Sequence, residues 1–479
     1  MISAAEMRRL LVDGGFADST ARGFADALAA LGPPSSGDRP DAFEHEAAEI
    51  GRVCRTGREL LDRLPLRSTR VAAERAAGDA VVRAMAEASR RFFRARRALI
   101  YDRLTVHRTQ PLRLEELAAK GADLLPGILP NAAELARESE RLQMDKDGLE
   151  LHQGLFFSEL LSDPSIGLHL CAAMLRPTPR ALALQAEFER TGRVDLGAAY
   201  VEVAGEVAYV ELRHPKYLNA EDDETLPAHE TACDLVLLHP GVKMGVLRGG
   251  VIEHPRYQGR RIFSAGLNLT RLYHGKISFL FYLVRDLGFV NKLYRGLLTD
   301  PEGLNPDELA NGPERTLEKP WVAVVEGFAI GGGCQLLLVM DYVIAESGAY
   351  CNLPARKEGI IPGCANLRLP RLVGERAARE AIMFDRAFQV DHADAAGLVN
   401  QVCPRERIDE AIRECTANAI GSGMVSASGN RKALRVQAEP LDTFRAYMAT
   451  YTGEQAFCHL SEQLIENLRK HWRAAERRL

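Results

Sequence analysis

The chain has 479 residues, of which 46% are apolar and 26% charged, and its 61 basic and 65 acidic residues give a net charge of −4. This composition excludes a disordered or fibrous chain and is typical of a globular protein with two or three domains. The near balance of charge gives no indication of a nucleic-acid partner.

Residues 1–195 are predicted to form a helical N-terminal domain. Apolar residues recur there at three- and four-residue spacing, as in GRVCRTGRELLDRLPL (51–66), which is typical of amphipathic helices. Loop signals interrupt the pattern at 32–41 and 124–134. Since such helices present an apolar face, we expect them to pack against the rest of the chain.

The segment RRFFRARRALIYDRLTVHR (90–108) concentrates arginine among aromatic residues. It could bind nucleic acid or phosphate, but charge runs are more often solvated helix faces whose arginines pair with nearby glutamates. We favour the second interpretation and assign the segment no function.

The pattern changes after residue 195. VDLGAAYVEVAGEVAYVELRHP (194–215) alternates apolar and polar residues around an Ala-Gly turn, which predicts a β-hairpin. Strand-like and helix-like segments then alternate, among them a long helical stretch at 277–298 and the strand WVAVVEG (321–327). This α/β pattern predicts a core domain at 196–435, followed by a C-terminal helical segment at 436–479.

The cysteines and the N-terminal sequence indicate the cellular compartment of the protein. The nine cysteines are scattered, without a C-x-x-C pair or a compact cluster with histidine, so we expect reduced thiols. The opening MISAAEMRRLLVDGGFADST lacks the apolar core of a signal peptide, and no run of about 18 apolar residues occurs. We therefore expect a soluble, cytoplasmic protein without a membrane partner.

Two glycine motifs follow short apolar stretches. In FSAGLNL (263–269), Gly266 allows a tight turn after which Leu267 presents its N–H into a cleft, although a plain strand-to-helix turn is the alternative. In GFAIGGGCQLLLVMD (327–341), three glycines expose the first N–H groups of a helix to a ligand oxygen. No Lys-Ser/Thr follows, so this turn suits one carbonyl-sized oxyanion better than a phosphate.

A third motif is NLPARKEGIIPGCANLRLPRLVG (352–374). Together with the first two motifs and FQVDHADAAGLVNQVCP (388–404), it resembles the crotonase or enoyl-CoA hydratase superfamily, over about residues 200–435. The resemblance implies an α/β fold, a crotonase-like ββα superhelix preceded here by an all-helical N-terminal domain. It also implies trimeric association and an acyl-CoA thioester whose carbonyl oxygen is held by the N–H groups of Leu267 and Gly332. Two such donors stabilise the enolate that forms when the α-carbon loses a proton.

Two positions depart from the hydratase pattern that the resemblance implies. Gln335 and Ala355 stand where hydratase-type members carry glutamates. Without both carboxylates, the addition of water across a double bond lacks its general acid and base.

One branch of the superfamily matches these departures. LNAED (218–222), GVLRGGVIEHPRYQGRRIFSAGLNL (245–269) and FRAYMA (444–449), with the second and third motifs, resemble the cofactor-independent (3,5-dihydroxyphenyl)acetyl-CoA dioxygenases of vancomycin-type glycopeptide-antibiotic biosynthesis. The resemblance implies an oxidoreductase that converts the thioester and O₂ into 3,5-dihydroxyphenylglyoxylate and CoA. It implies no cofactor, neither metal nor flavin, because CoA is part of the substrate and O₂ is a co-substrate. A homotrimer or a dimer of trimers is expected.

An aryl-acetyl thioester has an unusually acidic benzylic α-proton, so groups that orient the phenol hydroxyls matter more than a strong base. Gln335 suits a hydroxyl because an amide both donates and accepts. On the resemblance, Glu221 and Arg285 also contact the ring hydroxyls. The alternatives are a helix-start role for Glu221 and a surface ion pair of Arg285 with Asp286 or Glu302.

Dioxygen is small and apolar, so it needs a dry pocket beside the carbanion. We expect this pocket to be lined by Ala355 and Ile360, with Leu269 opposite, although core packing is the alternative. The residues expected to bind CoA flank the motifs and are Lys216, His254, Tyr257 and Arg260.

Three function hypotheses follow. The dioxygenase is favoured. A thioesterase, or a hydratase that takes its acid from Glu358 or Glu326, is the second. The third is a non-catalytic acyl-CoA-binding protein. Oxygen uptake with an aryl-acetyl-CoA separates the first from the other two.

Overall fold

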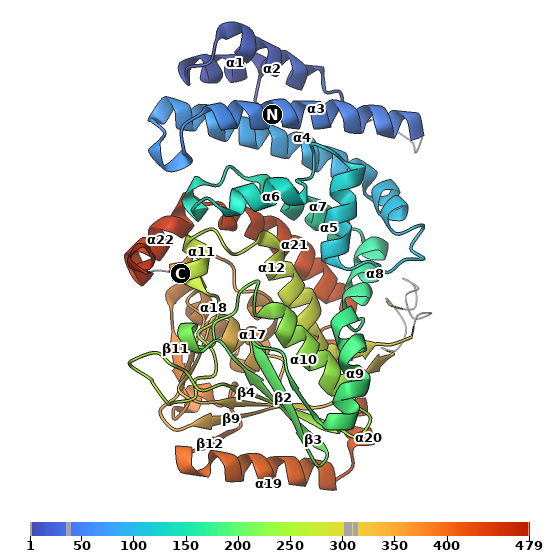
Figure 1. Ribbon diagram of the computed structural model, residues 1–479, viewed down its shortest axis with the longest axis vertical. Coiled ribbons are helices and arrows are strands. Elements are labelled where there is room, and N and C mark those ends of the chain that lie inside the picture. The colour runs from blue at the N-terminus through green and yellow to red at the C-terminus, as the bar shows by residue number, and fades with distance from the viewer. Residues whose placement is uncertain (1, 35–39, 301–308, 310–314, 478) are drawn as a thin grey trace.

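The computed structural model describes residues 2–34, 40–300, 309, 315–477 and 479. Helices form the N-terminal part of the chain and lie over one end of a core that contains the β-sheets (Figure 1). These N-terminal helices are α1 (Ala4–Asp13), α2 (Asp18–Ala30), α3 (Pro40–Arg63), α4 (Ala72–Leu104), α5 (Leu114–Leu124), α6 (Ala132–Ser139), α7 (Leu149–Ser162), α8 (Pro164–Met174) and α9 (Pro179–Thr191).

Helix α7 joins the N-terminal helices to the core. Every residue from Glu150 to Leu161 is buried, because α7 packs against α4 and also against α21 (Leu441–His459) near the C-terminus. One continuous hydrophobic cluster accordingly runs from the first helices into the sheets. The N-terminal helices end at Thr191, and the domain boundaries at 195 and 435 stay predictions.

The arginine-rich segment 90–108 lies largely in α4. Arg94 Nη2 lies 3.0 Å from Glu159 Oε1, and Arg96 Nη2 lies 2.8 Å from Glu46 Oε1. Pairing with acidic residues therefore agrees with the favoured interpretation. The expectation of a solvated face is wrong for part of the segment, because Arg96 and its aromatic neighbours are buried.

The main sheet has seven strands in the order β1-β2-β3-β4-β7-β9-β12. Strands β1 to β3 pair antiparallel, which confirms the predicted hairpin, and the strands from β3 to β12 pair parallel. All five residues of β7 are buried, as expected of a strand covered on both faces. The strands are β1 (Arg193–Asp195), β2 (Ala199–Ala204), β3 (Val207–Leu212), β4 (Met244–Gly249), β7 (Trp321–Val325), β9 (Tyr342–Glu346) and β12 (Gln401–Cys403).

Two smaller sheets complete the core. One has the order β11-β10-β8 and the other pairs β5 with β6. Their strands are β5 (Leu297–Leu298), β6 (Thr316–Leu317), β8 (Phe328–Ile330), β10 (Tyr350–Asn352) and β11 (Ala387–Gln389). The helices of this part are α10 (Leu226–Leu238), α11 (Leu269–Tyr273), α12 (Phe279–Val284), α13 (Asn291–Arg295), α15 (Gly332–Leu337), α16 (Ala355–Glu358), α17 (Ala365–Val373), α18 (Glu375–Phe384), α19 (Ile408–Gly421), α20 (Met424–Ala438) and α22 (Glu462–Trp472).

The stretch predicted as one helix at 277–298 differs from that prediction. A π-helical turn, η4 (Arg285–Val290), separates α12 from α13. Gly296, with φ +78°, ends the helix, and the next two residues form strand β5. Arg285 is the first residue of this π turn, and such turns occur frequently at functional sites.

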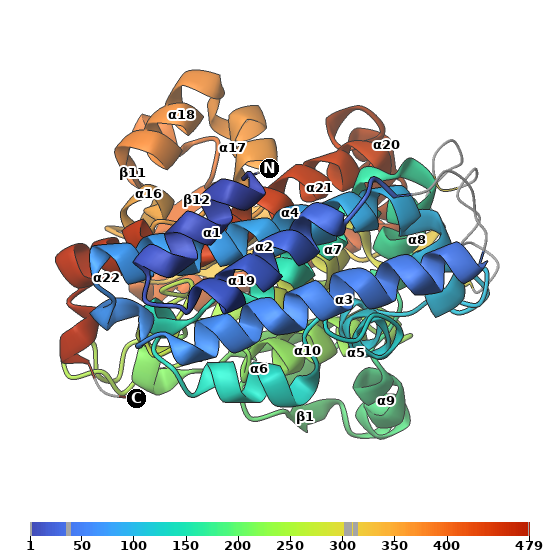
Figure 2. The ribbon, with the colours of Figure 1, turned by 90° about the horizontal axis from the view of Figure 1, so that it is seen from above.

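The C-terminal helices return to the N-terminal part. Helix α21 packs against α7 and α8, and α22 packs against α16. Figure 2 shows α3 and α4 lying along the molecule, with α17 and α18 projecting to one side. Among the described residues, no helix is both long and apolar enough to cross a bilayer.

Candidate active site

The glycine trio lies where β8 passes into α15. Gly331 adopts φ +52°, a left-handed conformation that favours glycine. A Cβ on Gly332 would overlap Glu221 Oε2, and a Cβ on Gly333 would lie 2.8 Å from Ser264 Cβ. The missing side chains therefore allow this turn to approach two other segments closely.

The segment around Gly266 forms the facing wall. Gly266 has φ +77°, and a Cβ there would lie 2.5 Å from Ile330 O and 2.8 Å from Gly332 N. Glu221 N donates to Gly266 O at 2.7 Å, and Asn268 N donates to Glu221 O at 2.9 Å. These bonds fix the backbone on both sides of Leu267.

Leu267 and Gly332 line the same cavity, whose volume is about 30 Å³. Neither backbone N–H donates a hydrogen bond to another residue in the part of the chain that the structure describes. Two unpaired N–H groups beside one cavity are what an oxyanion hole requires.

A buried charge network forms the polar side of the cavity. Arg285 Nε donates to Glu221 Oε2 at 2.9 Å. Its Nη1 donates to Gln335 Oε1 at 2.8 Å and to Asp286 Oδ1 at 3.0 Å. Its Nη2 donates to Gly332 O at 2.8 Å. The guanidinium thus ties the glycine turn to the three polar side chains around it.

The interpretation of Arg285 as a surface residue is wrong, because only 4% of it is exposed. Burial disfavours its charge, but the attraction of Glu221 and Asp286 raises the pKa of Arg285 above its ordinary value. Burial raises the pKa of Asp286 even though Arg285 lies beside it. Glu302, the other partner considered, lies outside the described residues.

The helix-start role considered for Glu221 belongs to its neighbour. Asp222 Oδ1 accepts from Glu224 N at 3.0 Å and from Thr225 N at 3.1 Å, just before α10 begins. Glu221 itself points into the cavity, where its Oε1 has no hydrogen-bond partner among the described residues. The hydroxyl of Tyr282, another cavity residue, has none either. Buried polar atoms are rarely left unpaired, so both atoms are available to a ligand that carries hydroxyl groups.

The opposite side of the cavity is apolar. Ala355 and Ile360 line it, together with Leu353, Ile361 and Pro362. Leu269 is buried at the start of α11 and is not among the lining residues. The cavity therefore has one polar side and one apolar side.

Several lining residues lie outside the sequence motifs. Phe281, Tyr282 and Asp286 come from the interrupted helix α12–η4, and Tyr451 comes from α21. Nothing in their local sequence distinguishes them from core residues, because their position depends on how distant helices pack. Glu358 also lines the cavity. The sequence offers it as a candidate, because it is the one acidic residue of the third motif.

The two acids considered for a hydratase differ in their surroundings. Glu326 is ion-paired with Arg248, whose Nε and Nη2 lie 2.6 and 2.9 Å from its carboxyl oxygens. Glu358 is 4% exposed, and burial raises its pKa to about 7. Only Glu358 is a residue of the cavity.

The residues expected to bind CoA lie on two adjoining loops and are Lys216, His254, Tyr257 and Arg260. Glu253 N donates to Pro215 O at 3.2 Å, which joins the loops. Lys216 is exposed, whereas Arg260 Nη2 is ion-paired with Glu346 Oε1 at 2.7 Å. Lys216 Nζ lies 5.0 Å from the centroid of the Tyr217 ring and has no ion pair among the described residues, whereas Arg260 already has a carboxylate partner.

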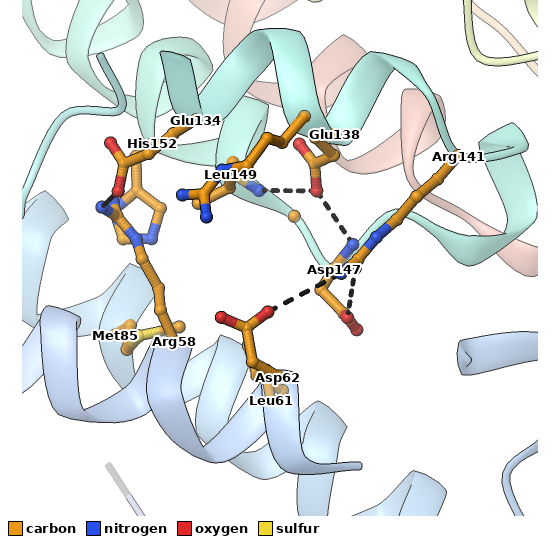
Figure 3. A pocket seen from close by; sticks show the side chains of 12 residues that line it. Arg58, Leu61, Asp62, Met85, Glu134, Glu138, Arg141, Asp147, Leu149 and His152 are labelled. Carbon is orange, nitrogen blue, oxygen red and sulfur yellow. Dashed lines mark hydrogen bonds and ion pairs between the residues drawn. The ribbon is translucent and has the colours of Figure 1, made fainter. Parts of the chain in front are cut away.

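A second cavity, of about 130 Å³, lies among the N-terminal helices (Figure 3). Its arginines face acidic side chains: Arg58 Nη1 lies 2.8 Å from Glu134 Oε1, and Arg141 Nη1 lies 3.1 Å from Asp147 Oδ2. These ion pairs bring α3, α6 and the segment before α7 together. We therefore assign this cavity a structural role and not a catalytic one.

Comparison with known proteins identifies the family. A protein of Amycolatopsis orientalis named (3,5-dihydroxyphenyl)acetyl-CoA 1,2-dioxygenase is 46% identical over 415 residues, which cover 86% of this chain and 92% of that protein. The chain belongs to the family of this dioxygenase. The enoyl-CoA hydratase/isomerase family matches residues 314–463. Membership confirms the predicted crotonase-type α/β fold behind an N-terminal helical region.

Hydratases are more distant relatives of this dioxygenase family member. The short-chain-enoyl-CoA hydratase of Clostridium acetobutylicum is 28% identical over 264 residues, which cover 54% of this chain and 90% of that protein. The crystal structure of an enoyl-CoA hydratase from Bacillus halodurans is 20% identical with a TM-score of 0.46, and the match covers 57% of this chain and 99% of that chain. Among the described residues, no group of three or more His, Cys, Asp or Glu side chains could hold a metal ion.

Proposed function

We propose that the protein is a cofactor-independent dioxygenase that converts (3,5-dihydroxyphenyl)acetyl-CoA and O₂ into 3,5-dihydroxyphenylglyoxylate and CoA. The relative from Amycolatopsis orientalis is named for the dioxygenation of this thioester, and the match covers 86% of this chain and 92% of that protein. The observation that carries the proposal is the cavity, where two unpaired backbone N–H groups, a buried charge network and an apolar wall meet.

The N–H groups of Leu267 and Gly332 hold the thioester oxygen in this proposal. When the α-carbon loses its proton, negative charge moves onto that oxygen, and both donors then bind it more strongly than they bind the neutral carbonyl. Removing one donor of this kind typically lowers the rate by about 10²–10³-fold. The anion is also delocalised into the aromatic ring, which lowers the energy of the carbanion further.

The buried network orients the ring. Glu221 Oε1 accepts from one phenol hydroxyl, because this oxygen has no other partner among the described residues. Gln335 accepts from Arg285 through Oε1, so its NH₂ group is free to donate to the second hydroxyl. Arg285 acts here by fixing both side chains and by attracting the negative charge that develops on the ring.

Dioxygen occupies the apolar side of the cavity, next to Ala355 and Ile360. Electron transfer from the carbanion to O₂ and recombination give a peroxide on the α-carbon. The peroxide attacks the thioester carbonyl and expels the CoA thiolate. Cleavage of the O–O bond with loss of the second α-hydrogen yields the α-keto acid. Both oxygen atoms of O₂ enter the product, and the protein supplies no electrons.

The CoA-binding residues, the oligomeric state, the location and the pathway of the enzyme are also part of the proposal. CoA is bound by the two adjoining loops through Lys216, His254, Tyr257 and Arg260. The enzyme is a cytoplasmic homotrimer or dimer of trimers that makes a precursor of dihydroxyphenylglycine for a glycopeptide antibiotic. What supports this setting is the resemblance of the motifs to those of the antibiotic-pathway dioxygenases.

Isotopic labelling under controlled oxygen tests the function. The protein is incubated anaerobically with (3,5-dihydroxyphenyl)acetyl-CoA, ¹⁸O₂ is then admitted, and CoA release, metal content and product mass are followed. We expect CoA release only after oxygen is admitted, and two ¹⁸O atoms in each product molecule. CoA release without oxygen would identify a thioesterase, and binding without either reaction would identify a non-catalytic protein.

A further inference from the structure

The position of Glu358 is fixed by its surroundings. Glu358 ends the short helix α16, and Gly359, with φ +83°, turns the chain away. Helix α22 holds this turn: a Cβ on Gly359 would lie 2.8 Å from Leu464 Cα, and Asn467 Nδ2 donates to Arg356 O at 3.0 Å. Helix α22 therefore holds the backbone on both sides of Glu358 in place.

The carboxyl of Glu358 faces the glycine turn. Its Oε1 lies 3.8 Å from the point where a Cβ of Gly331 would stand. Gly331 directly precedes Gly332, whose N–H is one of the two proposed oxyanion donors. Because the α-carbon of a thioester is bonded to the carbonyl carbon, a base for the α-proton must lie within a few ångströms of that oxyanion site.

The other carboxylates near the cavity are engaged with Arg285. Glu221 accepts from its Nε at 2.9 Å and Asp286 accepts from its Nη1 at 3.0 Å. Glu358 makes no ion pair or side-chain hydrogen bond with another described residue, and burial is the cause that raises its pKa to about 7. A carboxylate that titrates near neutral pH is a stronger base than an ordinary glutamate and is still available in its ionised form.

The other ionisable groups around Glu358 come from three helices and from the network of Arg285. The hydroxyl of Tyr282, from α12, has its pKa raised well above the ordinary value by burial. The same is true of Tyr451 from α21. On α16 itself, Arg356 and Lys357 are directed to Asp385, at 3.1 and 3.5 Å. The charged groups that share the cavity with Glu358 are Glu221, Arg285 and Asp286.

We infer that Glu358 is the catalytic base that removes the α-proton of the bound thioester. This inference rests on the proposed function. The proton moves from the α-carbon to a carboxyl oxygen of Glu358, and the electron pair of the C–H bond is delocalised over the α-carbon, the ring and the thioester oxygen. Protonated Glu358 then gives this proton to the sulfur of the departing CoA, so that the carboxylate is restored for the next turnover.

The test compares Glu358→Gln with Lys357→Gln, a neighbour on the same helix whose side chain is directed away to Asp385. O₂ uptake with (3,5-dihydroxyphenyl)acetyl-CoA is measured from pH 5.5 to 9, and binding of the same thioester is measured anaerobically. In the wild type, kcat/KM should rise with pH and level off above about 7, because the ionised base is required. Glu358→Gln should lose at least about 10²-fold in kcat and the dependence on pH near 7, while it binds the thioester normally. Lys357→Gln should behave as the wild type.

Glu358→Asp provides a second variant that keeps a carboxyl group. It should retain more activity than Glu358→Gln and should keep a rise of activity with pH. If Glu358→Gln folds, binds and consumes O₂ at half the wild-type rate or faster, the inference is overturned and the proposed function stands. If the wild type releases CoA without consuming O₂, the proposed function fails and the inference fails with it.

Discussion

Burial of Glu358 has a thermodynamic consequence that can be measured without substrate. The side chain is 4% exposed, and burial raises its pKa from 4.5 to about 7. Because the pKa is higher in the folded than in the unfolded state, the folded protein binds more protons between these two values. The contribution of this residue to stability is therefore fully present below pH 4.5 and is lost as pH rises to 7 and beyond.

The size of the loss follows from the two pKa values. Each pKa unit corresponds to about 1.4 kcal/mol, so ionised Glu358 lowers the free energy of unfolding by about 3 kcal/mol. Glu358→Gln removes this ionisation with little change of shape. Relative to the wild type, the variant should gain about 3 kcal/mol as pH rises from 4.5 to 8.5. For a chain of 479 residues that unfolds as one unit, this gain corresponds to a shift of about 3 °C in Tm.

The assay is differential scanning fluorimetry of the wild type, Glu358→Gln and Lys357→Gln at half-unit steps of pH. Only the difference between the wild type and Glu358→Gln should change with pH, with its midpoint between 4.5 and 7. A difference in Tm that stays constant from pH 4.5 to 8.5 would show that Glu358 ionises normally. A normally ionising Glu358 would be a weaker base than the proposed role requires.

Four further substitutions test other parts of the site. Gly266→Ala places a Cβ 2.5 Å from Ile330 O, so it should separate the two oxyanion segments and lower kcat by about 10²-fold with a smaller effect on Tm; an unchanged kcat would argue against the oxyanion hole. Gln335→Ala should slow turnover of the dihydroxylated thioester more than that of phenylacetyl-CoA, whereas equal slowing would remove its proposed role with the hydroxyl. Ala355→Phe should raise the KM for O₂ sharply, and an unchanged KM would count against the oxygen pocket. Arg285→Met leaves two buried carboxylates without their cation and should lower the free energy of unfolding by about 3–5 kcal/mol in chemical denaturation; a loss under 1 kcal/mol would contradict the network.

The sequence could predict the parts of the site that depend on local backbone geometry. Gly266 and the glycine trio are needed where the chain adopts positive φ or approaches another segment closely, and such requirements are visible as motifs. The hairpin of β2 and β3 was predictable for a similar reason, since its alternation of apolar and polar residues reflects one buried face. Both kinds of signal lie within a few residues of the structure that they specify.

Contacts between distant segments could not be predicted in this way. Tyr282 and Tyr451 enter the cavity from helices that are far apart in sequence, and each looks like an ordinary core residue. The alternative considered for Arg285, an ion pair on the surface, was wrong because Arg285 and the rest of η4 are buried in the folded chain. Glu358 could be picked out from the sequence as a candidate acid, but its raised pKa could not, because this depends on burial in the folded chain.

The most direct test of the central claim is a crystal structure with a non-reactive amide analogue of (3,5-dihydroxyphenyl)acetyl-CoA. The carbonyl oxygen should lie about 2.7–3.1 Å from both Leu267 N and Gly332 N. The ring hydroxyls should contact Glu221 and Gln335, and the α-carbon should face Glu358. A carbonyl oxygen bound to only one of the two amides, or a ring that does not contact Glu221 and Gln335, would contradict the proposed oxyanion hole and ring site.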